Sequence, residues 1–459
     1  MALTFKPTLM PHQTEAKAWC LEKEKGGCLL ALVMGAGKSI VSLAVMVQRP
    51  MKTLLVLPLS LLAQWESEIT THTTGFTVAV HHGVKRMSKE NQEKMQNADV
   101  VLTTYNTVWS DYKNQRPEIY DAFERVIIDE AHKLRERKSK MHIAMSEVFS
   151  DVEHKILLTG TPIANGMQDL ISMFYMMNHT PFNDPKHWSG MTVEDKAEQV
   201  LELRKKYVLY KTAEETISDK LPQISIMNSS MGFQNPTNSG IYENVLNGHI
   251  PTDYLIQKII KLRQCANDVK LLKDENIANE ISDKLAMTKE IIKNLPAGEK
   301  VVIFSQWLGM LEILHDNIEE KSVIYHGNLK KEDKNALINA FKTDDSIRIM
   351  YITLKAGSVG LNLTVANHAI ICEPYFNAAE ENQAISRVFR IGQTKHVMVH
   401  KLQISNSVES WLKQLQKVKS KMTDLILNNI GDIKELQEDV ADKKSMFDQF
   451  INNIAPKEE

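Results

Sequence analysis

A chain of 459 residues is too long for one ordinary domain and suits two or three. Its 43% hydrophobic and 24% charged residues exclude a disordered, collagen-like or coiled-coil protein, and its net charge of −2 excludes a globally basic nucleic-acid coat while allowing a locally basic groove. No apolar run approaches the roughly 20 residues of a membrane helix, and the N-terminus has no signal-peptide pattern, so we expect a soluble, intracellular protein without a membrane partner. The four scattered cysteines are expected to be reduced thiols in the core.

Short apolar runs in the first half are typical of buried parallel strands. They lie at residues 29–34, 53–57, 100–103, 126–128 and 156–158. Helix-like segments separate them, for example at 40–47 and 62–69. This alternation predicts a parallel sheet covered by helices on both faces.

From about residue 167 to about 279 the pattern changes to long helical stretches without a convincing succession of strands. Apolar runs then return at residues 300–304, 322–325, 347–352, 369–372 and 397–402, and a polar helical tail follows. The sequence therefore predicts an α/β protein with two parallel-sheet lobes. We expect an N-terminal lobe over 1–225 with a helical insert from about 167, a helical insert or linker over 226–280, a C-terminal lobe over 281–410 and a helical tail over 411–459.

A glycine loop follows the first apolar run and precedes a helical segment. Its residues are Gly35, Ala36, Gly37, Lys38 and Ser39. A strand, a glycine turn and a helix N-terminus form a cradle whose backbone N–H groups bind phosphate, where Lys38 would reach the β- and γ-phosphates and Ser39 would bind Mg²⁺. The strict GxxxxGK[ST] spacing is not met because Leu32 replaces the first glycine, and a plain glycine turn is the alternative.

An acidic pair, Asp129 and Glu130, comes directly after another buried strand. At the carboxyl end of a parallel strand, Asp129 can hold Mg²⁺ and Glu130 can polarise the water that attacks a γ-phosphate. A simple turn at the end of a strand is the alternative. The turn TGTP at 159–162 follows the next strand and could couple the nucleotide state to a movement of the lobe.

A third polar stretch lies in the second lobe. Gln383, Arg387 and Arg390 fall at i, i+4 and i+7 of a predicted helix capped by Asn377, so they would share one stripe. Two guanidinium groups on one stripe suit the developing charge of a γ-phosphate, whereas a solvated basic face is the alternative. The segment 354–363 contains two glycines, Gly357 and Gly360, that could offer backbone donors to a phosphate of ATP or of a nucleic acid.

The basic run Lys133, Arg135, Arg137, Lys138 and Lys140 could contact a phosphate backbone or form a solvated face. Trp19, Trp65, Trp109 and Trp307 are interpreted as core or strand-end packing. The histidines show no clustering typical of a metal site.

Taken together, these stretches resemble the Swi/Snf family of DNA translocases within helicase superfamily two, in order from about residue 9 to residue 415. The matching motifs are LMPHQ (9–13), GAGKS (35–39), PLSLLAQWE (58–66), TTY (103–105), DEAH (129–132), LTGTPIAN (158–165), LRQC (262–265), VIFSQ (302–306), YHG (325–327), LKAGSVGLNLT (354–364) and RIGQ (390–393). The resemblance implies two RecA-like lobes that hold ATP and Mg²⁺ between them. It assigns catalysis to Lys38, Asp129, Glu130, Arg387 and Arg390, the metal to Ser39 and Asp129, and ATP binding to Gln13, the loop 35–39, Gly360 and Gln383.

The resemblance also implies that double-stranded DNA is bound by Ser60, Thr104, Ser305, Gln306, Thr353 and Lys355. It implies a monomeric motor that an unknown partner protein directs to its site of action. Such a motor would work in the cytoplasm of a bacterium or for a phage, or in a nucleus or viral factory. The function expected is ATP-driven translocation along duplex DNA; a strand-separating DNA or RNA helicase and an ATP-gated DNA clamp with little hydrolysis are the alternatives.

Overall fold

The computed structural model describes residues 2–164, 166–250, 254–273, 282–357 and 361–428. Contacts divide the chain into two compact units. Unit 1 contains Met1–Ser218 and a C-terminal segment that begins at Met422, and unit 2 contains Asp219–Lys421. Each unit is described by itself below.

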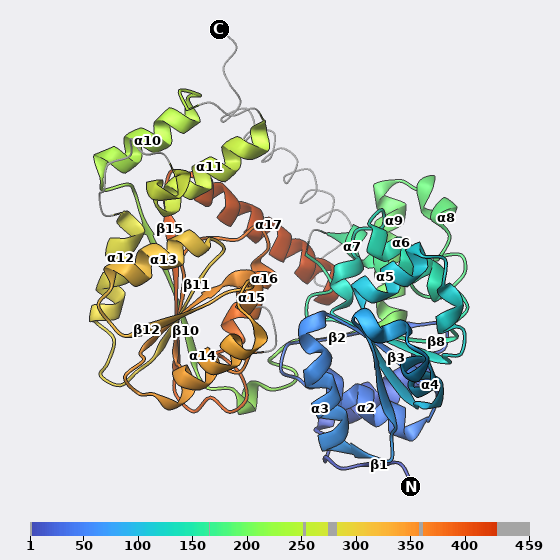
Figure 1. Ribbon diagram of the computed structural model, residues 1–459. Coiled ribbons are helices and arrows are strands. Elements are labelled where there is room, and N and C mark those ends of the chain that lie inside the picture. The colour runs from blue at the N-terminus through green and yellow to red at the C-terminus, as the bar shows by residue number, and fades with distance from the viewer. Residues whose placement is uncertain (1, 165, 251–253, 274–281, 358–360, 429–459) are drawn as a thin grey trace. The chain divides into compact units, whose positions relative to one another are not determined.

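Unit 1 is built on a parallel sheet, which is seven-stranded among the described residues (Figure 1). Its strand order is β5 (Val78–His81), β6 (Val100–Thr104), β3 (Thr53–Leu57), β7 (Arg125–Asp129), β8 (His154–Leu158), β2 (Cys28–Leu32) and β9 (Val208–Lys211). All neighbouring pairs are parallel, as the alternation of apolar runs and helices predicts. A small antiparallel pair, β1 (Thr4–Phe5) with β4 (Thr73–Thr74), lies apart from this sheet.

Two groups of helices cover the two faces of this sheet, which explains why its central strands are apolar on both sides (Figure 1). One group contains α1 (Pro11–Lys23), α2 (Lys38–Gln48) and α3 (Leu62–His72). The other group contains α5 (Tyr105–Lys113), α6 (Lys140–Val148), α7 (Met167–Phe174) and α9 (Val193–Tyr207). The shorter helices α4 (Lys89–Asn97) and α8 (Pro185–Ser189) complete the unit.

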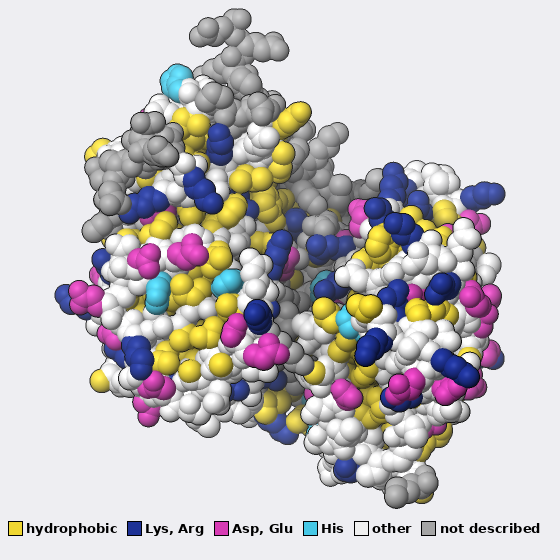
Figure 2. Space-filling model, viewed as in Figure 1, with side chains coloured by type: hydrophobic (Ala, Val, Ile, Leu, Met, Phe, Trp, Pro, Cys, Tyr) yellow, Lys and Arg dark blue, Asp and Glu magenta, His cyan; other side chains and the backbone are white. Residues whose placement is uncertain are grey.

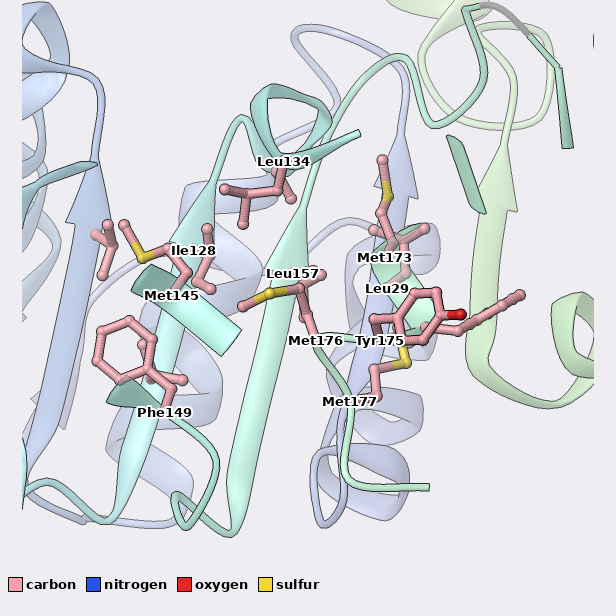
Figure 3. Packing of buried hydrophobic residues seen from close by; sticks show 14 of the residues in the cluster. Leu29, Ile128, Leu134, Met145, Phe149, Leu157, Met173, Tyr175, Met176 and Met177 are labelled. Carbon is pink, nitrogen blue, oxygen red and sulfur yellow. The ribbon is translucent and has the colours of Figure 1, made fainter. Parts of the chain in front are cut away.

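One buried hydrophobic cluster of unit 1 lies between the sheet and the second group of helices. Figure 3 shows Ile128 and Leu157 from the sheet against Met145 of α6 and Phe149, which directly follows this helix, and these side chains are fully buried. Residues 425–427, at the end of α17 (Val408–Asn428), belong to the same buried cluster. Burial of apolar surface at about 25 cal/mol per Å² makes clusters of this kind the main stabilising contribution to a domain.

Unit 2 contains a second parallel sheet, with six strands among the residues described. Its order is β10 (Ile224–Met231), β15 (Val397–Ile404), β14 (His368–Ile371), β11 (Val301–Ser305), β13 (Ile349–Thr353) and β12 (Ser322–Tyr325). Its helices are α10 (Pro236–Leu246), α11 (Leu255–Asn267), α12 (Asp283–Lys293), α13 (Leu308–Asn317), α14 (Lys331–Thr343), α15 (Leu354–Gly357), α16 (Ala378–Ile385) and the first part of α17. The predicted fold class, two parallel-sheet lobes with helices, is confirmed.

One expectation is wrong: the stretch between residues 167 and 279 is not purely helical. It contains β9 of the first sheet and β10, which pairs with β15 over eight residues. β10 lies at the edge of its sheet and is largely exposed in its middle, so it lacks the apolar run by which buried strands are recognised. The domain boundaries drawn at 225, 280 and 410 stay predictions.

All four cysteines are buried and free, which confirms that they belong to the core. Among the described helices we find no segment whose length and hydropathy would let it span a bilayer. Within the same residues, no three His, Cys, Asp or Glu side chains are grouped as a metal centre would require.

Candidate nucleotide and nucleic-acid sites

The topology of the first sheet gathers most of the predicted unit 1 residues at one edge. In the order β6-β3-β7-β8-β2, the carboxyl ends of neighbouring strands lead into Thr104, Ser60, Asp129, the TGTP turn and the glycine loop, respectively. Ligands of open parallel sheets bind at this edge because the loops from adjacent strands converge there.

The glycine loop connects β2 to α2 and has the shape expected for a phosphate cradle. Gly35 and Gly37 have φ values of 84° and 87°, a left-handed conformation that glycine adopts without strain. Gly37 is the N-cap of α2, and a Cβ atom at this position would collide with Nε2 of Gln13. The loop therefore presents backbone and a helix N-terminus, the combination that binds anions.

Gln13, a predicted ATP-binding residue, lies in the first turn of α1 and contacts the loop directly. Its Nε2 donates to the carbonyl of Ala36 at 3.0 Å, and its Oε1 accepts from the backbone N–H of Met10 at 3.0 Å. Nε2 of His12 lies 3.0 Å from the same carbonyl. Both side chains are buried, so α1 holds the loop in place through two neighbouring residues, of which the sequence indicated only Gln13.

Lys38 and Ser39 open α2. The ammonium of Lys38 donates to the carbonyl oxygens of Leu32 at 2.9 Å and Val33 at 3.5 Å, which places its charge beside the loop. The hydroxyl of Ser39 donates to Oε2 of Glu68 on α3 at 3.3 Å. Hydroxyl and carboxylate oxygens are the hard donors that Mg²⁺ prefers. The hydroxyl of Ser39 therefore fits the predicted metal, as does the carboxylate of Asp129.

Asp129 ends β7 in a polar setting within the core. Its Oδ2 accepts from Nε1 of Trp65 at 2.8 Å, and its Oδ1 accepts from the backbone N–H of Glu130 at 2.8 Å. Burial, followed by the charge of Glu130, raises the pKa of Asp129 to about 6. Trp65 is buried, as predicted, but it also orients this carboxylate, a role that its apolar neighbours in sequence did not indicate.

Glu130 has φ of 56°, an uncommon left-handed conformation for a residue with a side chain. Its Oε2 lies 3.1 Å from Nδ1 of His132, and this nitrogen lies 3.1 Å from the hydroxyl of Thr159. The backbone N–H of Thr161 donates to the same hydroxyl at 3.0 Å. The acidic pair and the TGTP turn are therefore connected through His132, as a coupling role for that turn requires.

The two predicted DNA-binding residues of unit 1 differ in accessibility. Ser60 is exposed in the short 3₁₀ helix Leu59–Leu61. Thr104 is buried as the N-cap of α5, where its hydroxyl accepts from the backbone N–H of Thr107 at 3.2 Å. The exposed His82 lies beside it, with Nδ1 at 3.5 Å from the Thr104 hydroxyl. A DNA contact by Thr104 stays a prediction.

In unit 2, the neighbouring strands β14, β11 and β13 end at Glu373, Ser305 and Thr353 or close to them. Ser305 is fully buried, and its hydroxyl lies 3.1 Å from both carboxylate oxygens of Glu373. The half-buried Gln306 donates its backbone N–H to Oε1 of Glu373 at 2.6 Å. The hydroxyl that the sequence assigned to DNA thus binds a buried carboxylate, and a direct DNA contact by Ser305 stays a prediction.

Glu373, which the sequence analysis missed, sits in a buried polar network. Burial raises its pKa to about 7, although the charges of Lys284 and Arg263 act in the opposite direction. Lys284 is itself fully buried and donates to Oε1 of Glu409 at 2.5 Å. The apolar run before Glu373 could have indicated that this residue follows a strand. The sequence could not indicate the residues that Glu373 contacts, because they are distant in the chain.

Thr353 is half-buried at the end of β13, and Lys355 is exposed on α15. Gly360 lies outside the described residues. Of the remaining predicted residues, Gln383 is buried on α16.

The expected single helical stripe of Gln383, Arg387 and Arg390 is wrong, because α16 ends at Ile385. The chain tightens there: backbone N–H groups of Arg387 and Val388 bond three residues back, and the carbonyl of Arg387 accepts from the N–H of Leu363. Nε of Arg387 donates to the carbonyl of Gly357 at 2.9 Å, and a terminal nitrogen of Arg390 donates to that of Leu361 at 3.2 Å. Both guanidinium groups therefore contact the glycine segment 354–363.

Comparison with known protein families agrees with this arrangement. A family model described as SNF2-related domain matches residues 12–295, and one described as helicase conserved C-terminal domain matches residues 283–392. The chain belongs to the SNF2-related family. It combines the SNF2-related domain with the helicase conserved C-terminal domain.

Three curated relatives show how the core occurs in longer and in similar-sized proteins. Human chromodomain-helicase-DNA-binding protein 8 is 27% identical over 94% of this chain, which spans 19% of that protein. The putative ATP-dependent helicase/translocase YwqA of Bacillus subtilis is 28% identical over 94% of the chain and 50% of its own length. The probable global transactivator of Orgyia pseudotsugata multicapsid polyhedrosis virus is 27% identical, with 94% of both chains covered.

Among solved structures, the chain is similar to the Sulfolobus solfataricus SWI2/SNF2 ATPase core in complex with dsDNA. The two are 25% identical over 97% of this chain and 98% of the other, with a TM-score of 0.43.

Proposed function

We propose that this chain is an ATP-dependent translocase that moves along double-stranded DNA. The observation that carries the proposal is the convergence, at the carboxyl ends of β2, β8 and β7, of a glycine phosphate loop, a threonine turn and the pair Asp129–Glu130. Membership of the SNF2-related family supports a helicase-like motor, and the name of YwqA, a putative ATP-dependent helicase/translocase, supports ATP-driven translocation.

The residues of unit 1 divide the work of ATP hydrolysis. The loop and the N-terminus of α2 bind phosphates, and Lys38 adds a charge-assisted contact. Ser39 and Asp129 would hold Mg²⁺, which supplies neutralisation of phosphate charge. Glu130 orients and deprotonates the attacking water, while Trp65 keeps the carboxylate of Asp129 in position.

Contacts to DNA would be made with its phosphates, so that movement does not depend on sequence. The exposed Ser60 in unit 1 and the exposed Lys355 in unit 2 are the strongest candidates. Thr104, Ser305, Gln306 and Thr353 stay predictions. The assignments of Gln383, Arg387 and Arg390 to ATP hydrolysis, the monomeric state, the intracellular location and the targeting partner also stay predictions.

Two assays test the proposal. ATP hydrolysis is measured without nucleic acid and with single-stranded DNA, duplex DNA and RNA, and we expect duplex DNA to stimulate well above the others. In the second assay, a third strand bound in the major groove should be displaced when ATP is hydrolysed, whereas a forked duplex should stay paired.

The outcomes separate the alternatives. Efficient opening of the fork, or equal stimulation by RNA and duplex DNA, would overturn the proposal in favour of a strand-separating helicase. Tight ATP-dependent DNA binding with negligible hydrolysis would favour a nucleotide-gated clamp.

A further inference from the structure

A basic cavity lies in unit 1, outside the nucleotide cradle. It has a volume of about 350 Å³ and lies between the loop 135–138, α7, α8 and the first turns of α9. This volume is within the range of about 300–1,000 Å³ typical of ligand pockets. Its lining contains none of the residues assigned above to ATP or Mg²⁺.

Four cations line the cavity: Arg135, Arg137, Lys138 and Lys196. In the part of the chain that the structure describes, none of them forms an ion pair with a carboxylate. Glu136 also lines the cavity, but its Oε1 accepts from the backbone N–H of Lys138 at 3.2 Å. Like charges held together repel one another, and a bound anion relieves this repulsion.

Arg137 is held in position by a neutral partner. A terminal nitrogen of its guanidinium donates to the hydroxyl of Tyr175 at 2.6 Å, and the group lies over the Tyr175 ring, 4.7 Å from its centre. Tyr175 belongs to the buried cluster of unit 1, so it provides a fixed support (Figure 3). The indole N–H of Trp188, another wall of the cavity, donates to the carbonyl of Phe182 at 2.9 Å.

Such a support keeps the positive charge of Arg137 while fixing its direction. A planar, pre-oriented guanidinium matches phosphate oxygens in a bidentate manner, and lysines add point charges from other directions. Figure 2 shows Lys and Arg side chains gathering on the visible face of unit 1, over the region where Figure 1 places α6 to α9.

We propose that this cavity is a second anion site that binds phosphate groups, carried either by a free oligophosphate or by a nucleic-acid strand. Several cations from a single loop and a neighbouring helix suit a ligand with several charges, whereas one carboxylate would neutralise only one of them. The proposal goes beyond the translocase function and does not depend on it.

The test uses the full chain carrying Lys38→Ala, which weakens phosphate binding at the glycine loop. Isothermal titration with inorganic tripolyphosphate in magnesium-free buffer should show one binding event. Adding Lys196→Gln or Lys138→Gln should weaken this binding at least tenfold. Lys205→Gln is the matched control, because Lys205 is an exposed lysine of the same helix α9 that does not line the cavity, and it should have no effect.

A second titration distinguishes the sources of phosphate. If a nucleic-acid strand is the ligand, Lys196→Gln weakens binding of a fluorescent duplex and lowers the slope of log K against log salt by about 1. In that case tripolyphosphate also competes with the duplex for binding. If a free oligophosphate is the ligand, duplex affinity equals that of Lys205→Gln, and both ligands bind together.

The proposal is overturned if Lys196→Gln and Lys138→Gln bind both tripolyphosphate and duplex as the control does. Binding of polyglutamate but not of tripolyphosphate, with dependence on Lys196, would also overturn it and identify a site for an acidic protein segment. If DNA does not stimulate ATP hydrolysis by the unmodified chain, this result counts against the translocase function and leaves the anion site untouched.

Discussion

Trp65 and His12 show that the candidate nucleotide site depends on residues that position the reacting groups without taking part in the reaction. Nε1 of Trp65 holds the carboxylate of Asp129, and Nε2 of His12 lies at 3.0 Å from the loop carbonyl of Ala36. A hydrogen bond to a charged group contributes about 1.5–3 kcal/mol, enough to fix the orientation of a buried carboxylate. The reacting groups are therefore positioned by the packing of α1 and α3 around the sheet edge.

The first prediction concerns Lys38 and Glu130, whose removal should stop turnover for different reasons. Lys38→Ala deletes a cation beside the loop and should weaken ATP binding. Glu130→Gln keeps the shape of the side chain but removes its basicity, so ATP should still bind while single-turnover hydrolysis falls by about 10²–10⁴-fold. Equilibrium nucleotide binding and rapid-quench hydrolysis measure the two effects separately.

Glu66→Gln serves as the control for this pair, because Glu66 is an exposed carboxylate of α3. Its hydrolysis rate should equal that of the unmodified chain. Substantial hydrolysis by Glu130→Gln would remove Glu130 from the role of base.

At the scale of elements, α11, α12 and α17 are connected to the end of β11 by buried polar groups. Lys284 of α12 donates to Glu409 of α17 and, at 3.2 Å, to Oδ1 of Asn267 on α11. The guanidinium of Arg263, also on α11, donates to the carbonyl of Pro374, next to Glu373. Breaking a buried charged pair costs several kcal/mol, so this network fixes how the helices meet the sheet in unit 2.

The second prediction follows from Glu373. Its pKa is raised to about 7 in the folded protein, so the folded state holds a proton that the unfolded chain releases above its ordinary pKa. The stabilisation linked to this proton is complete at low pH and is lost as pH rises towards 7. Between pH 5 and pH 8, the unmodified chain should therefore lose stability relative to Glu373→Gln, on the order of 2–3 kcal/mol.

Urea unfolding of both proteins at the two pH values measures this difference. Glu409 faces the same network, and burial raises its pKa too. It is present in both proteins, so only the part of its titration that depends on the charge of Glu373 enters the comparison. An identical pH dependence for the two proteins would show that Glu373 is ionised throughout.

At the scale of the whole molecule, the balance of 55 basic and 57 acidic residues makes DNA binding a matter of local placement. Each unit carries its polar strand ends on one edge of a parallel sheet, and exposed candidates for phosphate contact lie there in both. Binding through phosphates releases counterions, which makes affinity fall steeply with salt.

The third prediction tests this point with Lys355. If Lys355 contacts a phosphate, Lys355→Gln should lower the slope of log K against log salt for duplex DNA by about 1 and should weaken binding equally for unrelated sequences. Lys342→Gln, at an exposed lysine of α14, should leave the slope unchanged. Fluorescence anisotropy at several salt concentrations gives both values, and equal slopes for the two variants would exclude Lys355 from the DNA contact.

The local pattern of the sequence was enough to predict most strands of both parallel sheets, the glycine loop before α2 and the acidic pair after β7. These features depend on short-range signals: apolar runs for buried strands, and glycines where φ is positive. The tertiary structure decided the rest, because it depends on contacts between residues far apart in the chain. Only the fold showed that Trp65 donates a hydrogen bond to Asp129, that the hydroxyl of Ser305 donates one to Glu373, and that edge strand β10 belongs to the second sheet. The tertiary structure also decided that α16 ends before Arg387. The carbonyl of Arg387 accepts a hydrogen bond from the backbone N–H of Leu363 and not from a further turn of the helix.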